Sequence, residues 1–189
     1  KNSDNKTCSG VANFAITPAI QASTSQLQRG FVKGRQYLQN IVELDAHARD
    51  QGTSSPTADH NMKKPPDPRI NISNTSILAF WDYATAFPSV AHEWINLVIR
   101  ARHLPPGLQA FVLCMYSMNN AFVCVDGMFV FLCWIFSGVL QGCPLSGSMF
   151  AMLINPILVC FERHIVNPGR GQMKACADDI GAALKELQT

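Results

Sequence analysis

The chain has 189 residues, of which 48% are hydrophobic and 15% are charged, and this composition excludes wholesale disorder, collagen-like repetition and a coiled coil. The formal net charge of +2 produces no strong overall field, so any nucleic acid would have to bind a local patch. The 7 cysteines include no CxxC pair, which disfavours a zinc site and favours a reducing compartment. The chain begins at Lys1 and closes without an obvious terminal element, so we expect a fragment with neither end native.

The first predicted element is a helix over residues 34–50 with one buried stripe, since its apolar residues recur at near-helical spacing. Residues 51–69, rich in Gly, Ser, Pro and Lys, then predict a surface loop or an insertion. The apolar run 77–83 contains an acid near its end and is typical of a central strand. The stripe of the helix consists of Leu38, Ile41, Val42 and Leu44.

Two helices are expected next, on either side of a pair of prolines. Ser89 is a favourable cap for the first helix, which should end before Pro105 and Pro106, and the second helix should follow these prolines. The first helix is expected to bury Val90, Trp94, Leu97, Val98 and Ala101.

A β-hairpin is predicted around Asp126 and Gly127, a dipeptide that favours a tight turn between the apolar segments 122–125 and 128–131. The stretch 121–140 is also long enough to raise a membrane span, which needs about 20 apolar residues. The Asp-Gly dipeptide interrupts that stretch and favours the hairpin.

The last part of the chain predicts a buried helix over 149–161, which Pro156 should kink, and a hairpin over 172–183 with Asp178 and Asp179 at its tip. The resulting order is helix, strand, helix, helix, hairpin, helix, hairpin. This order predicts an α+β fold, in which helices cover one face of an antiparallel sheet.

Acids at the ends of apolar segments are the main chemical signal in so weakly charged a chain. Asp82 ends one such segment, while Asp178 and Asp179 are adjacent within another. A buried carboxylate without a partner is costly, and neighbouring carboxylates repel unless a cation lies between them. Magnesium bound by all three would suit phosphoryl or nucleotidyl transfer. The alternative is that Asp82 caps a strand and the other two fill a turn.

Four blocks of sequence carry a resemblance to a known family. AFWDYATAFPSVAHEW (79–94), GVLQGCPLSGSMF (138–150) and ACADDIG (175–181) resemble motifs A, B and C of reverse transcriptases, in order and in approximate spacing. SQLQRGFVKGRQYLQNIVELD (25–45) is similar to the fingers segment that precedes motif A. The chain thus resembles the reverse transcriptase of a non-LTR, LINE-like retrotransposon over about residues 2–185.

This resemblance implies a polymerase palm with part of the fingers. Residues 1–69 would be the partial fingers region, with the loop or insertion at 51–69, and residues 70–189 would be the palm with motifs A, B and C. The thumb would be absent from this chain.

The resemblance also implies a two-metal site for Mg²⁺, with Mn²⁺ as an alternative ion. Asp82 would be the motif A ligand to both ions, and the Tyr83 carbonyl a further ligand. Asp178 would be the second shared ligand and Asp179 an accessory one.

Four residues would bind the incoming nucleotide according to the resemblance. Phe87 stands where a bulky side chain lies under the sugar and would favour deoxynucleotides; the alternative is a core phenylalanine. Gln141 would contact the nucleotide, and Gly142 would let the backbone approach it closely. Arg35 would meet template or triphosphate, or else be a solvated helix charge.

Nucleic-acid contacts are implied for Gln28, Gly30 and Lys33 in the fingers block and for Cys176 in motif C. Motif C usually has Tyr or Phe at the position of Cys176, so grip on the primer end is in doubt. Further departures in motif A are Thr85, where a basic residue is usual, and Pro88, where a second acid is common. Lys63 and Lys64 could also line a groove for the template.

The implied function is RNA-directed DNA polymerisation, with an RNA template, a DNA primer and deoxynucleoside triphosphates as partners, no membrane, and a nuclear location. The alternative is a catalytically inactive, nucleic-acid-binding remnant of a retroelement. A membrane protein that uses residues 108–140 is disfavoured because Asp126 would then lie in lipid.

Overall fold

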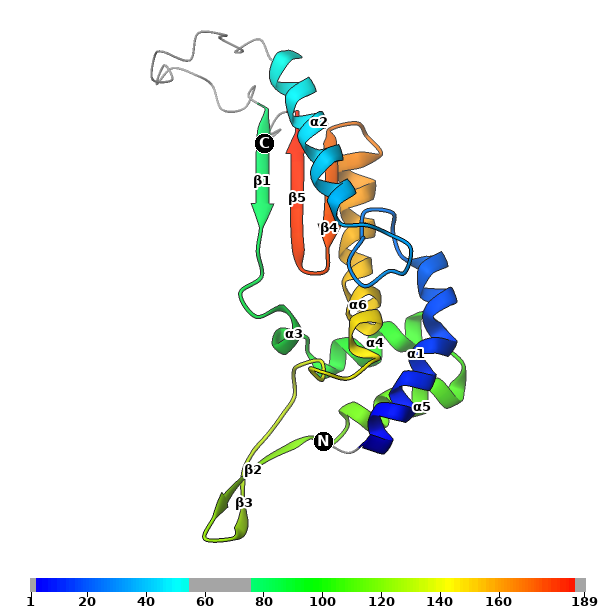
Figure 1. Ribbon diagram of the computed structural model, residues 1–189, viewed down its shortest axis with the longest axis vertical. Coiled ribbons are helices and arrows are strands. Elements are labelled where there is room, and N and C mark those ends of the chain that lie inside the picture. Colours follow the sequence, from blue (N-terminus) through cyan, green and yellow to red (C-terminus); the bar gives the residue numbers. More distant parts are fainter. Residues whose placement is uncertain (1–2, 55–75, 186–189) are drawn as a thin grey trace. The chain divides into compact units, whose positions relative to one another are not determined.

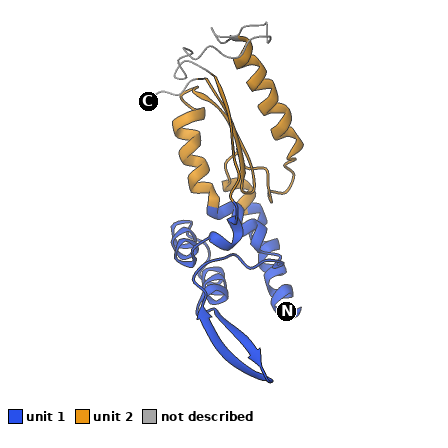
Figure 2. Cartoon of the chain, turned by 90° about the vertical axis from the view of Figure 1, so that its left-hand side faces the viewer, with its two compact units in different colours: residues 1–18, 84–153 blue, residues 19–83, 154–189 orange. Residues whose placement is uncertain are grey.

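The computed structural model describes residues 3–54 and 76–185 (Figure 1). The chain divides into two compact units, and each is built from separate parts of the sequence (Figure 2). Unit 1 contains residues 1–18 and 84–153, and unit 2 contains residues 19–83 and 154–189. These borders differ from the division at 69/70 expected from the sequence, and the assignment to fingers and palm stays a prediction. Residues 55–69 of the predicted loop lie outside the described part, whereas 51–54 end a helix.

Unit 1 consists of helices and one two-stranded sheet. Its core is formed by side chains that are almost fully buried: Ile95, Val98, Ile99, Val112, Leu145, Met149 and Leu153. Its elements are the greater part of α1 (Ser3–Ser23), α3 (Ala86–Ser89), α4 (His92–Ala101), α5 (Pro106–Tyr116), β2 (Asn120–Val125), β3 (Met128–Trp134) and the first half of α6 (Ser146–Phe161). Helix α1 was not anticipated from the sequence.

The hairpin around Asp126 is confirmed. Strands β2 and β3 pair antiparallel, with Val125 opposite Met128. Asp126 and Gly127 have φ angles of 50° and 78°, and positive φ at both central residues is the geometry of the type I′ turn that Asp-Gly favours. The membrane helix considered over this stretch is therefore wrong.

A different helical run has the length and composition of a membrane span among the described residues. It is Ser146–Val166, in which 44% of the most apolar stretch of 18 residues is buried inside the protein, and a buried core helix passes the same test. The run comprises α6, which contains Pro156, and the π-helical turn η2 (Glu162–Val166). It confirms the buried helix predicted over 149–161.

Unit 2 contains α2 (Leu38–Ser54), the second half of α6, η2 and a three-stranded antiparallel sheet. The sheet has the order β1 (Ile77–Trp81), β5 (Asp179–Leu184), β4 (Gly171–Cys176). The α+β fold class is confirmed, and β4 with β5 forms the hairpin predicted over 172–183. Helix α2 lies on one side of the sheet and α6 on the other, where the sequence predicted helices on one face (Figure 2). Coverage of both faces explains why four successive β5 residues, 180–183, are buried.

The strand before Asp82 is at an edge and not at the centre of the sheet. Strand β5 pairs with both β1 and β4, so β1 has a partner on one side only among the described residues. Strand β1 ends at Trp81, and its residues are half-buried or exposed.

Helix α2 is confirmed as an element, but its predicted buried stripe is wrong. Only Leu44 of the four stripe residues is buried, whereas Leu38, Ile41 and Val42 are 56%, 61% and 67% exposed. The helix instead turns polar side chains toward the sheet. The amides of Asn40 and Gln51 donate hydrogen bonds to the carbonyls of Ala175 and Ala183, at 2.9 and 3.4 Å.

Helix α4 begins later than predicted, and Ser89 is not its cap. Ser89 ends α3, and Ala91 occupies the N-cap position of α4. Residues 90–91 stay extended because Ala91 forms a bridge with Ser137 and the His92 N–H donates to the Phe136 carbonyl at 2.8 Å. The later start shifts the buried face.

That face consists of Ile95, Val98 and Ile99, while the predicted core residue Leu97 is 55% exposed. The end of the helix before the two prolines is confirmed, and α5 begins at Pro106, a favoured residue in the first helical turn.

We predict that Gly171→Ala destabilises the protein by about 1–3 kcal/mol, the range for overpacked sites. A Cβ atom at residue 171 would overlap the carbonyl oxygen of Ala183 and lie 2.9 Å from Leu184 Cα, so the β4–β5 ladder must shift. Urea unfolding of the variant measures this change. Gly52→Ala is the matched control: it has no atom within 4 Å of the new methyl group and lies in α2, so it should leave stability equal or higher.

Candidate active site

The pairing of β1 with β5 brings Asp82 and Asp179 together. In that ladder Trp81 lies opposite Ile180, so the next pair of positions is Asp82 and Asp179, just beyond the end of β1. Both aspartates are exposed, and both line a cavity of about 560 Å³.

Asp178 occupies the loop that joins β4 to β5. Cys176 pairs with Asp179 across the hairpin, which leaves Ala177 and Asp178 as the two loop residues. Asp178 is half-buried. Burial raises the pKa of the Cys176 thiol, and the negative charges of Asp179 and Asp178 raise it further. The loop is therefore a concentration of negative charge beside a neutral thiol.

The cavity at this end of the sheet is bounded by α2 and by all three strands. Lys174 is one of its lining residues, and the ammonium group of Lys174 is paired with Glu43. No Lys or Arg in residues 3–54 and 76–185 forms an ion pair with Asp82, Asp178 or Asp179. The remaining lining is largely apolar: Tyr37, Ile41, Leu44, Ala48, Leu78, Phe80, Trp81, Ile180 and Gly181.

The aspartates supply the oxygen ligands that Mg²⁺ prefers. Two carboxylates share one cavity and the third follows in the adjoining loop, so their chemistry fits the ion. Their side chains do not converge, however: the described residues contain no group of three or more His, Cys, Asp or Glu arranged to hold a metal. Tyr83, the predicted carbonyl ligand, is 46% exposed directly after Asp82.

The fingers block packs against the β4–β5 hairpin. Gln28 has no exposed surface and Gly30 is buried, so neither is available to a nucleic-acid strand in this structure, contrary to the sequence-based prediction. Lys33 is exposed, and its predicted role is untested. Lys63 and Lys64 lie outside the described residues.

Arg35 is neither a solvated charge nor free for a triphosphate. Its guanidinium donates to the carbonyls of Ser25 at 2.6 Å and Gln28 at 2.7 Å, and to those of Thr24 and Gln21 at 3.1 and 3.2 Å. Burial lowers the pKa of Arg35, and the positive charge of Arg29 lowers it further. The five donors of a guanidinium suit this task, and Arg35 fixes the path of residues 21–28.

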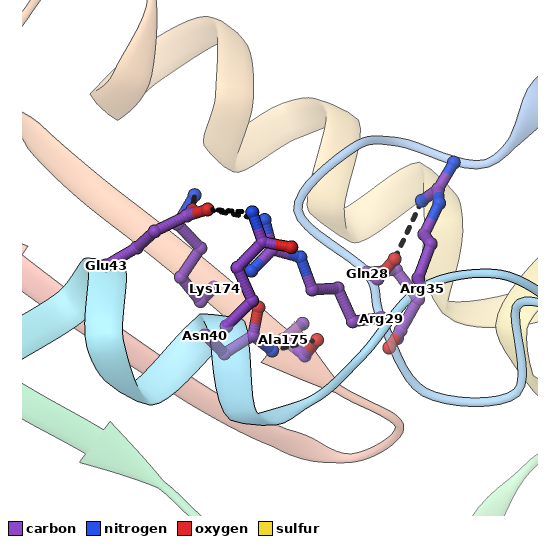
Figure 3. Close-up of polar contacts among 8 residues, drawn as sticks. Gln28, Arg29, Arg35, Asn40, Glu43, Lys174 and Ala175 are labelled. Atoms are coloured by element: carbon purple, nitrogen blue, oxygen red, sulfur yellow. Dashed lines mark hydrogen bonds and ion pairs between the residues drawn. The ribbon is translucent and has the colours of Figure 1, made fainter.

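Polar contacts around Glu43 join α2 to Arg29, which lies before that helix, and to Lys174 and Ala175 of β4 (Figure 3). The Glu43 carboxylate pairs with Arg29 at 2.8 Å and also with Lys174. Hydrogen bonds from Lys174 and Arg29 lower the pKa of Glu43 from 4.5 to about 2. Asn40 adds its hydrogen bond to the Ala175 carbonyl. Sequence reasoning missed Asn40, Glu43 and Lys174, since the partners are far apart along the chain.

The remaining predicted site residues lie in unit 1. Gln141 and Gly142 are exposed and line a second cavity of about 520 Å³, together with residues of α1 and α5. Gly142 has a φ of 74°, which explains the glycine. Phe87 is half-buried and stacks on Phe150, with ring centroids 4.4 Å apart and planes at 13°.

Comparisons with known proteins find similarity to a transposon protein and to a telomerase structure. No family model matches the chain. It is 25% identical over 112 residues to the Transposon TX1 uncharacterized 149 kDa protein of Xenopus laevis, a match that covers 56% of this chain and 9% of that protein. Its fold is similar to apo telomerase from Candida Tropicalis, truncated from its C-terminal domain, with a TM-score of 0.55 and 10% identity. That likeness covers 97% of this chain and 34% of the telomerase chain.

We predict that stability falls as the pH decreases from about 4.5 toward about 2, because protonation of Glu43 breaks its contacts with Lys174 and Arg29. A carboxylate whose pKa is lower in the folded than in the unfolded protein stabilises the fold at pH values above its unfolded pKa. This contribution is lost as the pH falls through its folded pKa. The urea concentration at the midpoint of unfolding should therefore fall less between about pH 5 and about pH 2 in Glu43→Gln than in the wild type. In Glu93→Gln, which removes an exposed carboxylate in α4, this fall should equal that of the wild type.

Proposed function

We propose that this chain is part of an RNA-directed DNA polymerase of a retroelement, with unit 2 carrying the metal-binding carboxylates of its palm. The observation that supports the proposal is the β1–β5 register, whose last pair, Trp81 and Ile180, is followed by Asp82 and Asp179, two residues that line one cavity. The transposon relative and the telomerase-like fold support the same class of protein. The chain spans only 9% of that relative and 34% of that telomerase chain, so the whole protein's activity belongs to the proposal.

In this proposal the carboxylates bind divalent cations and need not act as bases. Asp82 and Asp178 would hold two Mg²⁺ ions jointly, with Asp179 as an accessory ligand and the Tyr83 carbonyl as a further one; Mn²⁺ is the alternative ion. Ions bound by these residues would lower the pKa of the primer 3′-hydroxyl and stabilise the leaving pyrophosphate. Asp82 and Asp179 are exposed on the cavity and have no Lys or Arg partner in the described residues, so they are free to accept a cation.

Substrate contacts are assigned to exposed or half-buried residues. Phe87 limits the sugar to deoxyribose, and Gln141 with Gly142 contacts the incoming nucleotide. Lys33 offers an exposed charge to the template backbone, and Cys176 lies nearest the primer end. The partners are an RNA template, a DNA primer and deoxynucleoside triphosphates, and the location is the nucleus.

A second candidate is a catalytically inactive remnant that binds nucleic acid. Two observations favour it: the three aspartate side chains do not converge among the described residues, and Cys176 replaces the aromatic residue usual in motif C. The two candidates differ in chemistry and not in fold, so activity decides between them.

Primer extension tests the proposal. The chain, alone and within a longer protein that contains it, is given an RNA template, a DNA primer, deoxynucleotides and Mg²⁺. Because Asp82 and Asp178 are the shared ligands, Asp82→Asn and Asp178→Ala should each lower the rate by at least about 100-fold. Omission of the divalent ion should abolish extension.

Asp126→Asn is the matched control, since Asn-Gly suits the same type I′ turn and removes a carboxylate that is not a proposed ligand. It should retain full activity. Failure of the folded wild-type proteins to extend the primer would support the inactive remnant instead.

Phe87 provides a separate test of sugar selection. If its ring lies under the sugar, Phe87→Val should raise the ratio of ribonucleotide to deoxynucleotide kcat/KM by about tenfold or more, since a steric clash is removed. If the ring only packs on Phe150, the variant should lose stability without changing that ratio. Steady-state kinetics with both nucleotides, beside thermal unfolding, separates these outcomes.

A further inference from the structure

Residues 27–30 run along β4 like an added parallel strand. Gln28 forms a parallel bridge with Ala175. The Arg29 N–H donates to the Ala175 carbonyl at 2.9 Å, and the Ala175 N–H donates to the Leu27 carbonyl at 2.8 Å. The fingers block is therefore joined by backbone hydrogen bonds to the strand that ends at the aspartate loop.

The Gln28 side chain pairs with both polar backbone groups of Ala177. Its Nε2 donates to the Ala177 carbonyl at 3.0 Å, and its Oε1 accepts from the Ala177 N–H at 2.8 Å. The same Oε1 accepts from the Gly30 N–H at 2.7 Å. Only a primary amide supplies a donor and an acceptor together in this geometry. Gln28 itself has no surface exposed to water.

Ala177 requires such support because of its own conformation. Its φ is 58°, in the left-handed region that residues with a Cβ atom rarely adopt. It is the first of the two residues that connect β4 to β5, a position at which tight hairpins with one positive φ prefer glycine. The two bonds from Gln28 offset the strain at this residue, and Asp178 is the next residue in the chain.

Gly30 completes the contact from the other side. A Cβ atom at residue 30 would overlap the backbone nitrogen of Ala177 and lie 2.9 Å from its Cα. The backbone of the fingers block can thus approach the loop only because residue 30 has no side chain. Arg35 holds this approach in place through the carbonyls of Ser25 and Gln28.

We propose that Gln28 and Gly30 are positioning residues that fix the Ala177–Asp178 loop and so aim the carboxylates of Asp178 and Asp179, without touching nucleic acid. This role rests on the proposed function for its catalytic meaning, but the clamp on Ala177 is a property of the chain itself. Groups that orient metal ligands typically change metal affinity or activity by about 10–100-fold when removed.

The first experiment measures the clamp without any polymerase activity. Amide hydrogen exchange of the 189-residue chain is followed by NMR at residues 176–180 in the wild type, Gln28→Met and Gln28→Glu. Met keeps the length of the side chain but neither hydrogen bond, while Glu keeps the acceptor and loses the donor. Exchange at the Ala177 amide should rise by roughly tenfold or more in Gln28→Met and less in Gln28→Glu. Gln26→Met, at an exposed residue of the same segment, should change nothing.

The second experiment connects the clamp to the carboxylates. The Mg²⁺ concentration for half-maximal primer extension should rise about 10–100-fold in Gln28→Glu and in Gly30→Ala, with kcat falling and the KM for deoxynucleotide little changed. Thermal unfolding is recorded in parallel. A merely structural role would lower the melting temperature without moving the Mg²⁺ requirement.

The outcomes separate the two proposals. Unchanged exchange at the Ala177 amide in a folded Gln28 variant overturns the clamp. Faster exchange with no extension by the wild type leaves the clamp intact and overturns the proposed function. Faster exchange with an unaltered Mg²⁺ requirement in active protein overturns the positioning role. If Gln28→Met fails to fold, Gln28→Glu and Gly30→Ala decide the question by the same measurements.

Discussion

The double pairing of β5 is the constraint on which the candidate site depends. Strand β5 pairs with β1 on one side and with β4 on the other. This pairing fixes the position of Asp82 along the strand direction relative to the β4–β5 loop. A register slip of one residue would turn the β1 side chains to the opposite face and move Asp82 away from Asp179. The register of β1 on β5 therefore decides whether Asp82 and Asp179 lie beside the same cavity.

Three amide and guanidinium side chains in unit 2 hydrogen-bond to the protein's own backbone. Arg35 bonds four carbonyls, Gln28 bonds Ala177, and Asn40 bonds Ala175. Although only 15% of the residues are charged, these side chains stabilise irregular backbone around the β4–β5 hairpin. A basic or amide residue in such a sequence motif therefore need not contact a ligand. It can instead hold the backbone next to residues that bind the ligand.

The sequence predicted local features well where one short-range rule decides. The Asp-Gly turn, the break at Pro105 and the hairpin that carries Asp178 follow from turn chemistry and backbone restriction, and the structure confirms them. Predictions that needed the partner surface were wrong: the stripe of α2 is exposed apart from Leu44, and Ser89 does not cap α4. Periodicity reports which face is apolar, but not what packs on it. For the candidate site, motif order singled out Asp82 and Asp179, which line one cavity in the structure, whereas the burial of Gln28 depends on a contact 149 residues away.

The order in which unit 2 is synthesised has a consequence for how the protein folds. Residues 84–153 are inserted between the two parts of unit 2, so its sheet can close only after the whole of that segment has been made. The contact between Gln28 and Ala177 closes a loop of 149 residues, and a contact so distant in sequence slows folding because chain entropy is lost before the contact forms. Leu27, Gln28 and Gly30 can make these contacts only after β4 and β5 have been synthesised. Until then the backbone groups of this segment lack the partners that hold it beside the aspartate loop, and apolar surface of unit 2 stays exposed.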